Sequence, residues 1–318
     1  MNLSTVDVFK YIRPAGALEL TREQLESLQK TLTGMLWDIA DCCGKNHIRY
    51  ELGGGSALGA VRHQGFIPWD DDIDLNMPRA DHDRFVTAFA KEYGDRYWIH
   101  TPQETHDYGL TFTRVLKKGT CVKTREDFRN PDECGAFIDI FVIENTYDNA
   151  FLRWVHGTGC LSFGFLQSCA KFYRDRKEYL EMLEGPENSD GTSGAEGGSG
   201  SKEDLKRLRH VFCTKIAIGA VFSFFDLDRW TRITDRWYSR CKDGTSGYVA
   251  VPAGRNHFYG ELYLRNELCE TAQMSYEGRM QPVPAEWDAY LKRLYGDYMQ
   301  IPEDAGKEKH IFYAPFQL

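Results

Sequence analysis

The chain has 318 residues, of which 42% are hydrophobic and 14% aromatic, so it can bury a substantial core as one large domain or two smaller ones. Its formal net charge of −8 argues against nucleic acid, or a polybasic grip on anionic lipid, as the main partner. The nine cysteines are scattered without zinc-site spacing, so we expect reduced thiols in a cytoplasmic protein. The N-terminus lacks the basic and then apolar segments of a signal peptide.

Two amphipathic helices are predicted in the first hundred residues. Thr21-Arg22-Glu23-Gln24 has the pattern of a capping box, and leucines then recur at helical spacing until Gly44. Pro78 and Arg79 open the second helix, which runs to Gly94. Short strands are predicted at residues 97–100, 110–116 and 120–123.

A glycine-rich turn lies between these helices. Tyr50-Glu51-Leu52 has the character of a strand end, and Gly53-Gly54-Gly55 lets the backbone turn with little side-chain hindrance. Ser56 is well placed to cap a short helix. Free N–H groups and the positive end of that helix would then face an anion, and phosphate is the anion that such turns commonly bind.

Paired aspartates follow this turn in Asp72-Ile73-Asp74-Leu75. A strand would place both aspartates on one face, close enough to share one cation, and like charges at that distance would repel without it. Oxygen-only ligands favour Mg²⁺ or Mn²⁺ over zinc. The alternative is that residues 70–72 are a polar turn before a strand, but the glycine turn upstream favours the metal site.

One aspartate, Asp139, interrupts the apolar strand predicted at residues 136–143. A bare carboxylate there would cost several kcal/mol to bury, so it must be paired, protonated or bound to metal. An ion pair with a nearby arginine and ligation of a metal are even alternatives from the pattern alone. The need for a third ligand beside Asp72 and Asp74 favours the metal.

The second half of the chain is predicted to be mainly helical. Residues 216–225 form an apolar run too short to cross a bilayer, so we expect a buried core helix there, with contact at a membrane surface as the alternative. Residues 185–201, rich in glycine and serine, have the composition of natural and engineered flexible linkers. Shortening them should leave activity and melting temperature nearly unchanged. The predicted division is a catalytic core at residues 1–145 and a helical region packed on it at 146–318.

These motifs together resemble the nucleotidyltransferase fold, an α/β (α+β) class with a mixed sheet. More narrowly, residues 59–74 (GAVRHQGFIPWDDDID) closely resemble the signature of the LicD family of phosphotransferases. Relatives of that family include lipopolysaccharide and teichoic acid cholinephosphotransferases and fukutin-related proteins. Residues 137–141 resemble its second block, and Pro284, Tyr290-Leu291 and residues 295–299 resemble its C-terminal signature.

The resemblance implies transfer of a phospho-alcohol, typically phosphocholine from CDP-choline, to a hydroxyl of a cell-surface glycan. It further implies a lipid-linked precursor at the cytoplasmic face of the membrane. The identity of the alcohol, choline or ribitol, stays open, as do the acceptor and the number of metals. Two other functions compete: transfer of a nucleoside monophosphate from an NTP to a small molecule, and a catalytically inactive binding module.

The site that this interpretation predicts combines metal ligands with phosphate donors. Asp72 and Asp74 would hold Mg²⁺ or Mn²⁺, and Asp139 would share a second metal or take the proton of the acceptor. The remaining predicted contacts are to substrate: Gly54, Gly55 and Ser56 around the diphosphate, Arg62 or His63 on the same oxygens, Asp71, and Trp69 facing a quaternary ammonium. For Arg62 the alternative is a surface salt bridge, and for Trp69 a packed core position.

Overall fold

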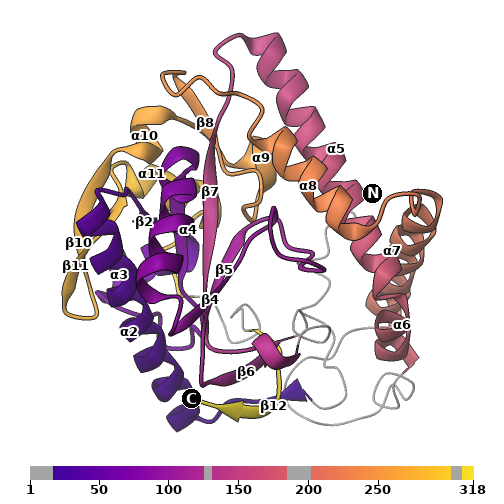
Figure 1. Cartoon of the computed structure of the whole chain (residues 1–318), viewed down its shortest axis with the longest axis horizontal. Helices are drawn as coiled ribbons and strands as arrows, with labels where there is room; N and C mark the ends of the chain where they lie inside the picture. The colour runs from indigo at the N-terminus through magenta and orange to yellow at the C-terminus, as the bar shows by residue number, and fades with distance from the viewer. Residues whose placement is uncertain (1–16, 125–130, 185–201, 302–309) are drawn as a thin grey trace.

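The computed structural model describes residues 17–124, 131–184, 202–301 and 310–318, so the linker predicted at 185–201 lies outside the described residues. Its centre is a mixed seven-stranded sheet (Figure 1), which confirms the predicted α+β class. The main path of the sheet runs β2 (Glu51–Leu52), β3 (Asp74–Pro78), β7 (Phe137–Asn145), β5 (Thr113–Lys117) and β4 (Tyr97–His100). The strands β8 (Tyr248–Ala250) and β9 (Leu262–Leu264) extend the sheet from the end of β7.

The register of three central strands brings charged residues together. β3 and β7 are parallel and place Asp74 beside Asp139. β5 is antiparallel to β7 and places Arg114 opposite Asp139. Because neighbouring strands lie only about 5 Å apart, these three side chains must share one small region of the sheet.

The two helices predicted in the first hundred residues begin at the N-terminal residues that the sequence pattern indicated. α2 (Arg22–Asn46) begins at the capping box, in which Thr21 and Gln24 exchange side-chain and backbone hydrogen bonds. α4 (Arg79–Tyr93) begins after Pro78, as expected. Both helices pack against the sheet through apolar side chains, including Leu32 and Phe85, which are fully buried. α3 (Gly54–His63) connects β2 to the acidic segment.

The second half of the chain builds a helical arm and a strand-rich return. The arm consists of α5 (Ala150–Arg174), α6 (Arg176–Glu184), α7 (Lys202–Val221) and α8 (Leu227–Tyr238), to the right of the sheet in Figure 1. The return contains α9 (His257–Gly260), α10 (Arg265–Cys269), β10 (Thr271–Tyr276), β11 (Arg279–Pro284), α11 (Trp287–Tyr295) and β12 (Phe312–Gln317). Apolar side chains of this return, such as Tyr290 and Phe312, lie in the same core cluster as those of α2. The division at residue 145 stays a prediction.

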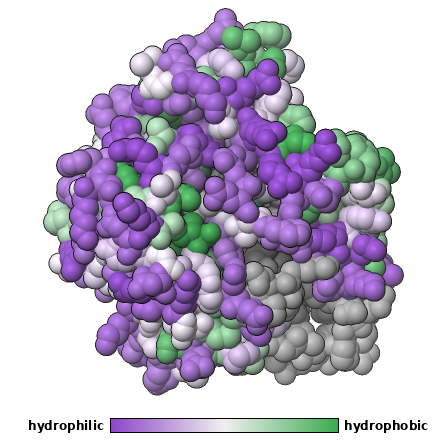
Figure 2. All heavy atoms as spheres, viewed as in Figure 1, coloured by the Kyte–Doolittle hydropathy of each residue, from purple (hydrophilic) through white to green (hydrophobic). Residues whose placement is uncertain are grey.

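The apolar run at residues 216–225 is not a buried core helix throughout. α7 ends at Val221, and the side chains of Val221 and Phe224 are 73% and 66% exposed. Figure 2 shows hydrophobic side chains on the surface at the right of the molecule, where α7 ends. Within the described part of the chain, every helix is too short or too polar to cross a bilayer.

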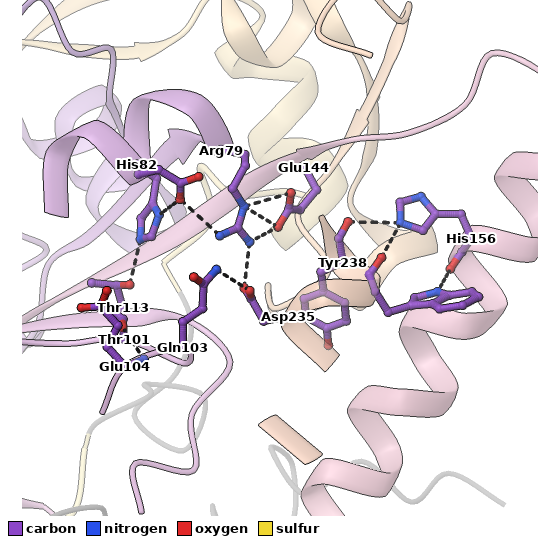
Figure 3. A network of polar contacts seen from close by, with 12 residues as sticks. Arg79, His82, Thr101, Gln103, Glu104, Thr113, Glu144, His156, Asp235 and Tyr238 are labelled. Carbon is purple, nitrogen blue, oxygen red and sulfur yellow. Dashed lines mark hydrogen bonds and ion pairs between the residues drawn. The ribbon is translucent and has the colours of Figure 1, made fainter. Parts of the chain in front are cut away.

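A buried ionic network joins the arm to the sheet (Figure 3). Arg79, at the start of α4, contacts Glu144 near the end of β7 and reaches Asp235 of α8 at 2.9 Å. Gln103 donates to the second oxygen of Asp235 at 2.6 Å. The side chains of Glu144 and Asp235 are only 2% and 5% exposed, so the arginine provides the charge compensation that buried carboxylates require.

Candidate active site

The glycine turn enters α3 at Gly54, three residues earlier than expected. Gly53 is the N-cap residue, so the prediction that Ser56 caps the helix is wrong. Ser56 lies in the first turn instead, and its Oγ accepts a hydrogen bond from the N–H of Asp74 at 2.9 Å. Gly54 has a φ of +45°, and a Cβ there would lie 3.0 Å from Oδ2 of Asp74. The turn therefore needs glycine both for its backbone and for the nearby carboxylate.

One N–H group of this turn is hydrogen-bonded within the protein, and two have no described acceptor. The N–H of Gly54 donates to Oη of Tyr290 at 2.9 Å. Among the described hydrogen bonds, those of Gly55 and Ser56 have no acceptor, as is usual in the first turn of a helix. A Cβ on Gly55 would lie 3.1 Å from Oδ2 of Asp70. The phosphate cradle stays a prediction for all three residues, with Gly55 and Ser56 the better placed.

Three half-buried carboxylates gather at this end of α3. Burial and then the charge of Asp72 raise the pKa values of Asp70 and Asp74 well above their usual range. Burial also raises the pKa of Asp72 to about 6, although the cation His310 opposes the shift. Asp70 and Asp72 share a hydrogen bond between their side chains. β3 begins only at Asp74, so Asp72 lies in the segment before the strand rather than within it.

Asp139 makes the ion pair that the sequence left as an alternative. Its two oxygens accept hydrogen bonds from Nε and Nη2 of Arg114 at 2.7 and 2.8 Å, and both side chains are 6% exposed. The guanidinium of Arg114 also stacks on the ring of Phe137 at 3.8 Å. Asp139 neighbours Asp74 in the sheet, but a role as metal ligand would require it to share an oxygen between Arg114 and the metal.

His310, which the sequence did not single out, contacts the acidic segment from the C-terminal end. Its Nδ1 lies 2.8 Å from an oxygen of Asp71 and 3.6 Å from one of Asp72, and its backbone N–H donates to Asp71. Burial lowers the pKa of His310, but the two carboxylates more than reverse this effect and raise it to about 10. The histidine is therefore a cation that pairs with these acids.

The metal-ligand spacing is only partly as predicted. Among the described residues, the group of three possible ligands whose atoms lie within 4.8 Å of one another is Asp71, Asp72 and His310, not Asp72, Asp74 and Asp139. A protonated histidine cannot bind a metal. The carboxylates of Asp70, Asp72 and Asp74 offer the oxygen donors that a hard divalent cation prefers, and their charges raise one another's pKa values, but they do not form such a group among the described residues.

The other predicted contacts lie around the first turn and end of α3. Nη1 of Arg62 donates to the carbonyl of Tyr298 at 2.6 Å, and its Nε lies 3.4 Å from Nδ1 of His63. His63 meets the half-buried Trp69 edge to face, with 6.5 Å between ring centroids. In this structure Arg62 therefore connects α3 to the C-terminal return, and the substrate contacts of these three residues stay predictions.

Two tyrosines of α11 complete the surroundings of the turn. Tyr290 holds the N–H of Gly54, and Oη of Tyr295 lies 3.5 Å from where a Cβ on Gly54 would be. Burial raises the pKa of Tyr295 well above its usual range, with further contributions from Tyr290 and Asp74. The resemblance of this segment to the C-terminal signature was the available signal, but no role for either hydroxyl could be predicted from it.

Comparison with known proteins identifies relatives of this region of the chain. A family model described as "LicD/FKTN/FKRP, nucleotidyltransferase domain" matches residues 47–157. Over 274 residues, the chain is 24% identical to the lipopolysaccharide cholinephosphotransferase LicD of Haemophilus influenzae, across 84% of this chain and 88% of that protein. A stretch of 30 residues is 60% identical to the human ribitol 5-phosphate transferase FKRP, across 9% of this chain and 6% of that protein. The glycine turn, the acidic segment and Asp139 thus all lie within the part of the chain that matches the LicD/FKTN/FKRP nucleotidyltransferase domain.

Proposed function

We propose that the protein is a metal-dependent phosphotransferase that moves a phospho-alcohol, phosphocholine from CDP-choline in the first instance, to a hydroxyl of a cell-surface glycan precursor. The observation that carries this proposal is the group of half-buried carboxylates, Asp70, Asp72 and Asp74, at the N-terminal end of α3. Their pKa values are raised by burial and by one another, so the site is prepared for a cation and, through it, for a phosphorylated substrate.

The chain's own residues divide the work of phosphoryl transfer. Asp72 and Asp74 would hold Mg²⁺ or Mn²⁺, which when bound neutralises charge on the phosphates of the donor. The N–H groups of Gly55 and Ser56 would donate to the diphosphate oxygens at the positive end of α3. Positioning and charge neutralisation are the main requirements of this reaction, so little else is needed from the protein.

Asp139 is proposed to act on the acceptor side. Arg114 fixes the orientation of its carboxylate through two hydrogen bonds, beside Asp74 on the neighbouring strand. From there it would take the proton of the acceptor hydroxyl, or share a second metal. The acceptor would be a glycan on a lipid-linked precursor at the cytoplasmic face of the membrane, and Trp69 would contact the choline group.

The experiment that tests this function compares nucleotide donors by the product they release. The purified protein with Mg²⁺ or Mn²⁺ and a membrane extract that supplies glycan hydroxyl acceptors is given CDP-choline, CDP-ribitol or CTP, and CMP, pyrophosphate and the modified glycan are measured by mass spectrometry. We expect CMP from a CDP-alcohol and no pyrophosphate from CTP, with loss of the CMP signal in Asp74→Asn. Pyrophosphate from CTP alone would establish nucleotidyl transfer instead, and binding of a donor without either product would establish an inactive module.

A further inference from the structure

Two cysteine thiols lie in contact where the strand β6 (Cys121–Thr124) meets the segment that leads into β7. Sγ of Cys121 lies 3.2 Å from Sγ of Cys134, and neither forms a disulfide in this structure. Cys134 directly follows the short helical turn Pro131–Glu133. Its side chain is buried, at 4% exposure, whereas Cys121 is partly exposed. One thiol of the pair can therefore meet solvent while the other is held inside.

Hydrogen bonds beside the two cysteines hold their backbones together. Oγ1 of Thr120 accepts from the N–H of Ala136 at 3.0 Å and donates to the carbonyl of Lys117 at 2.8 Å. The N–H of Lys117 donates to the carbonyl of Ala136, also at 2.8 Å. Gly135 permits this approach, because a Cβ there would lie 2.4 Å from the carbonyl oxygen of Lys117. The fold itself therefore keeps the two thiols close.

We propose that Cys121 and Cys134 are a site of reversible oxidation, at which the two thiols form a disulfide. Sulfur atoms in a disulfide are about 2.05 Å apart, so these two need to approach by about 1.2 Å, which side-chain rotation supplies. The pair stays reduced in a reducing compartment and reacts when an oxidant is present. The proposal goes beyond the proposed function and does not depend on it, because the bond forms without donor or turnover.

A peroxide is the oxidant that this geometry suits. Hydrogen peroxide converts the more exposed thiol, Cys121, to a sulfenic acid and releases one water molecule. Sγ of Cys134 then attacks the sulfur of Cys121, the S–OH bond breaks, and a second water molecule leaves. Two thiols and one hydrogen peroxide thus give one disulfide and two water molecules.

The bond would connect two supports of the candidate site. β6 pairs with β12, where Thr124 lies opposite Phe312, and the two strands run side by side in Figure 1. Phe312 comes two residues after His310, which contacts the acidic segment, and β7 carries Asp139. Because the thiols are already in contact, the bond preserves this arrangement and stabilises the fold by restricting the unfolded chain.

The test is peptide mapping of the full chain after treatment with hydrogen peroxide. Free thiols are alkylated at acidic pH, and the protein is digested with trypsin, which cleaves after lysine and arginine. The disulfide would join the peptide of residues 119–123 to that of residues 130–153. We expect this linked peptide in the oxidised sample, its loss on reduction with dithiothreitol, and a melting temperature raised by about 5 °C in the oxidised protein.

Single variants and a matched control keep the proposal falsifiable. Cys121→Ser and Cys134→Ser should each abolish both the linked peptide and the oxidative rise in melting temperature, and the partly exposed Cys121 is the safer substitution for folding. Cys213→Ser removes an exposed thiol outside the pair and should retain both effects. The proposal is overturned if both thiols are still alkylated at a peroxide concentration that oxidises Cys213, or if either one is linked to a third cysteine instead. An oxidised protein that melts below the reduced one would also contradict it, because the bond would then distort the fold.

Discussion

Acidic side chains lie at both ends of the parallel strands β3 and β7, but cations of the protein compensate their charges to different extents. At the C-terminal end of the strands, Glu144 and Asp235 both contact Arg79, and Gln103 donates to the remaining oxygen of Asp235 (Figure 3). At the N-terminal end, where β3 begins at Asp74, several aspartates share His310 as a counter-ion, and Arg114 is paired with Asp139. The carboxylates at the Glu144 end are therefore compensated by their own ion pairs and serve the structure. At the Asp74 end, the fold supplies too little positive charge to compensate the carboxylates.

The difference identifies which acids are available for function. Burial raises the pKa of Glu144, and Arg79 opposes the shift. Burial also raises the pKa of Asp74, but there the neighbouring carboxylates add to the shift instead of opposing it. Carboxylates whose charges are not compensated by the fold favour a cation from solution, and this is the physical argument for the metal that we propose at this position.

Removal of Asp74 should produce the largest effect on turnover. Asp74→Asn removes a carboxylate at the N-terminal end of α3, so turnover should fall about a thousandfold or more. Without metal the variant should be as stable as the parent or more stable, because one repelling charge is gone. A transfer assay and thermal melts measure both, with the exposed Asp95→Asn as control. Lower stability with normal turnover would place Asp74 among the structural acids.

Asp139 is paired with an arginine, as Glu144 is, but it neighbours Asp74 in the candidate site. Its variants therefore test whether this carboxylate serves structure, chemistry or both. Asp139→Asn strands the buried Arg114 and should cost about 3–5 kcal/mol of unfolding free energy in the absence of metal. Turnover should also fall, by about a hundredfold or more if the carboxylate takes the acceptor's proton. Thermal melts with and without Mg²⁺, beside the transfer assay, measure the two effects.

A double variant separates these two roles of Asp139. Arg114→Met with Asp139→Leu replaces the ion pair by apolar side chains and should restore most of the lost stability, because such exchanges are often neutral. We expect the double variant to stay inactive. Recovery of turnover together with stability would show that the pair serves the fold alone and would remove Asp139 from the proposed mechanism.

The opposite end of the strands should respond in stability and hardly in chemistry. Arg79→Met leaves Glu144 and Asp235 buried without their cation and should cost about 3–5 kcal/mol of unfolding free energy. The remaining folded protein should retain turnover within a few-fold at a temperature below its melting transition. The control Arg22→Met breaks an exposed pair with Glu26 and should cost less than about 1 kcal/mol. A collapse of turnover in folded Arg79→Met would mean that the two ends are coupled.

Local patterns in the sequence predicted the elements that position the site. The capping box of α2, the proline at the start of α4 and the apolar strand around Asp139 each depend on neighbours in the chain, and each appears where expected. The start of α3 was misplaced because three consecutive glycines allow the turn to close at any of them, whereas Ser56 suggested only one position.

Long-range partners could not be predicted in the same way. The contact of His310 with Asp71 joins residues 239 positions apart, and the bond from Gly54 to Tyr290 joins residues 236 apart. No periodicity or spacing signals such pairs. The choice of Arg114 as partner of Asp139 depends on the register of β5 against β7, which the composition of the two strands leaves open.

The last prediction concerns pH and gives the smallest effect. In the metal-free protein Asp72 has a pKa of about 6, above its usual 3.8, so the folded state keeps a proton that the unfolded state has already lost. Its contribution to stability is therefore present below pH 3.8 and disappears as the pH rises to about 6, a loss of about 3 kcal/mol. Asp72→Asn cannot undergo this change, so the stability of the parent relative to the variant should fall across that interval and then stay constant. Mg²⁺ at neutral pH should restore the parent but not the variant, since the metal binds the ionised carboxylate. Chemical denaturation at several pH values, with and without Mg²⁺, measures the difference, and parallel curves for the two proteins would mean that Asp72 is already compensated in the manner of Glu144.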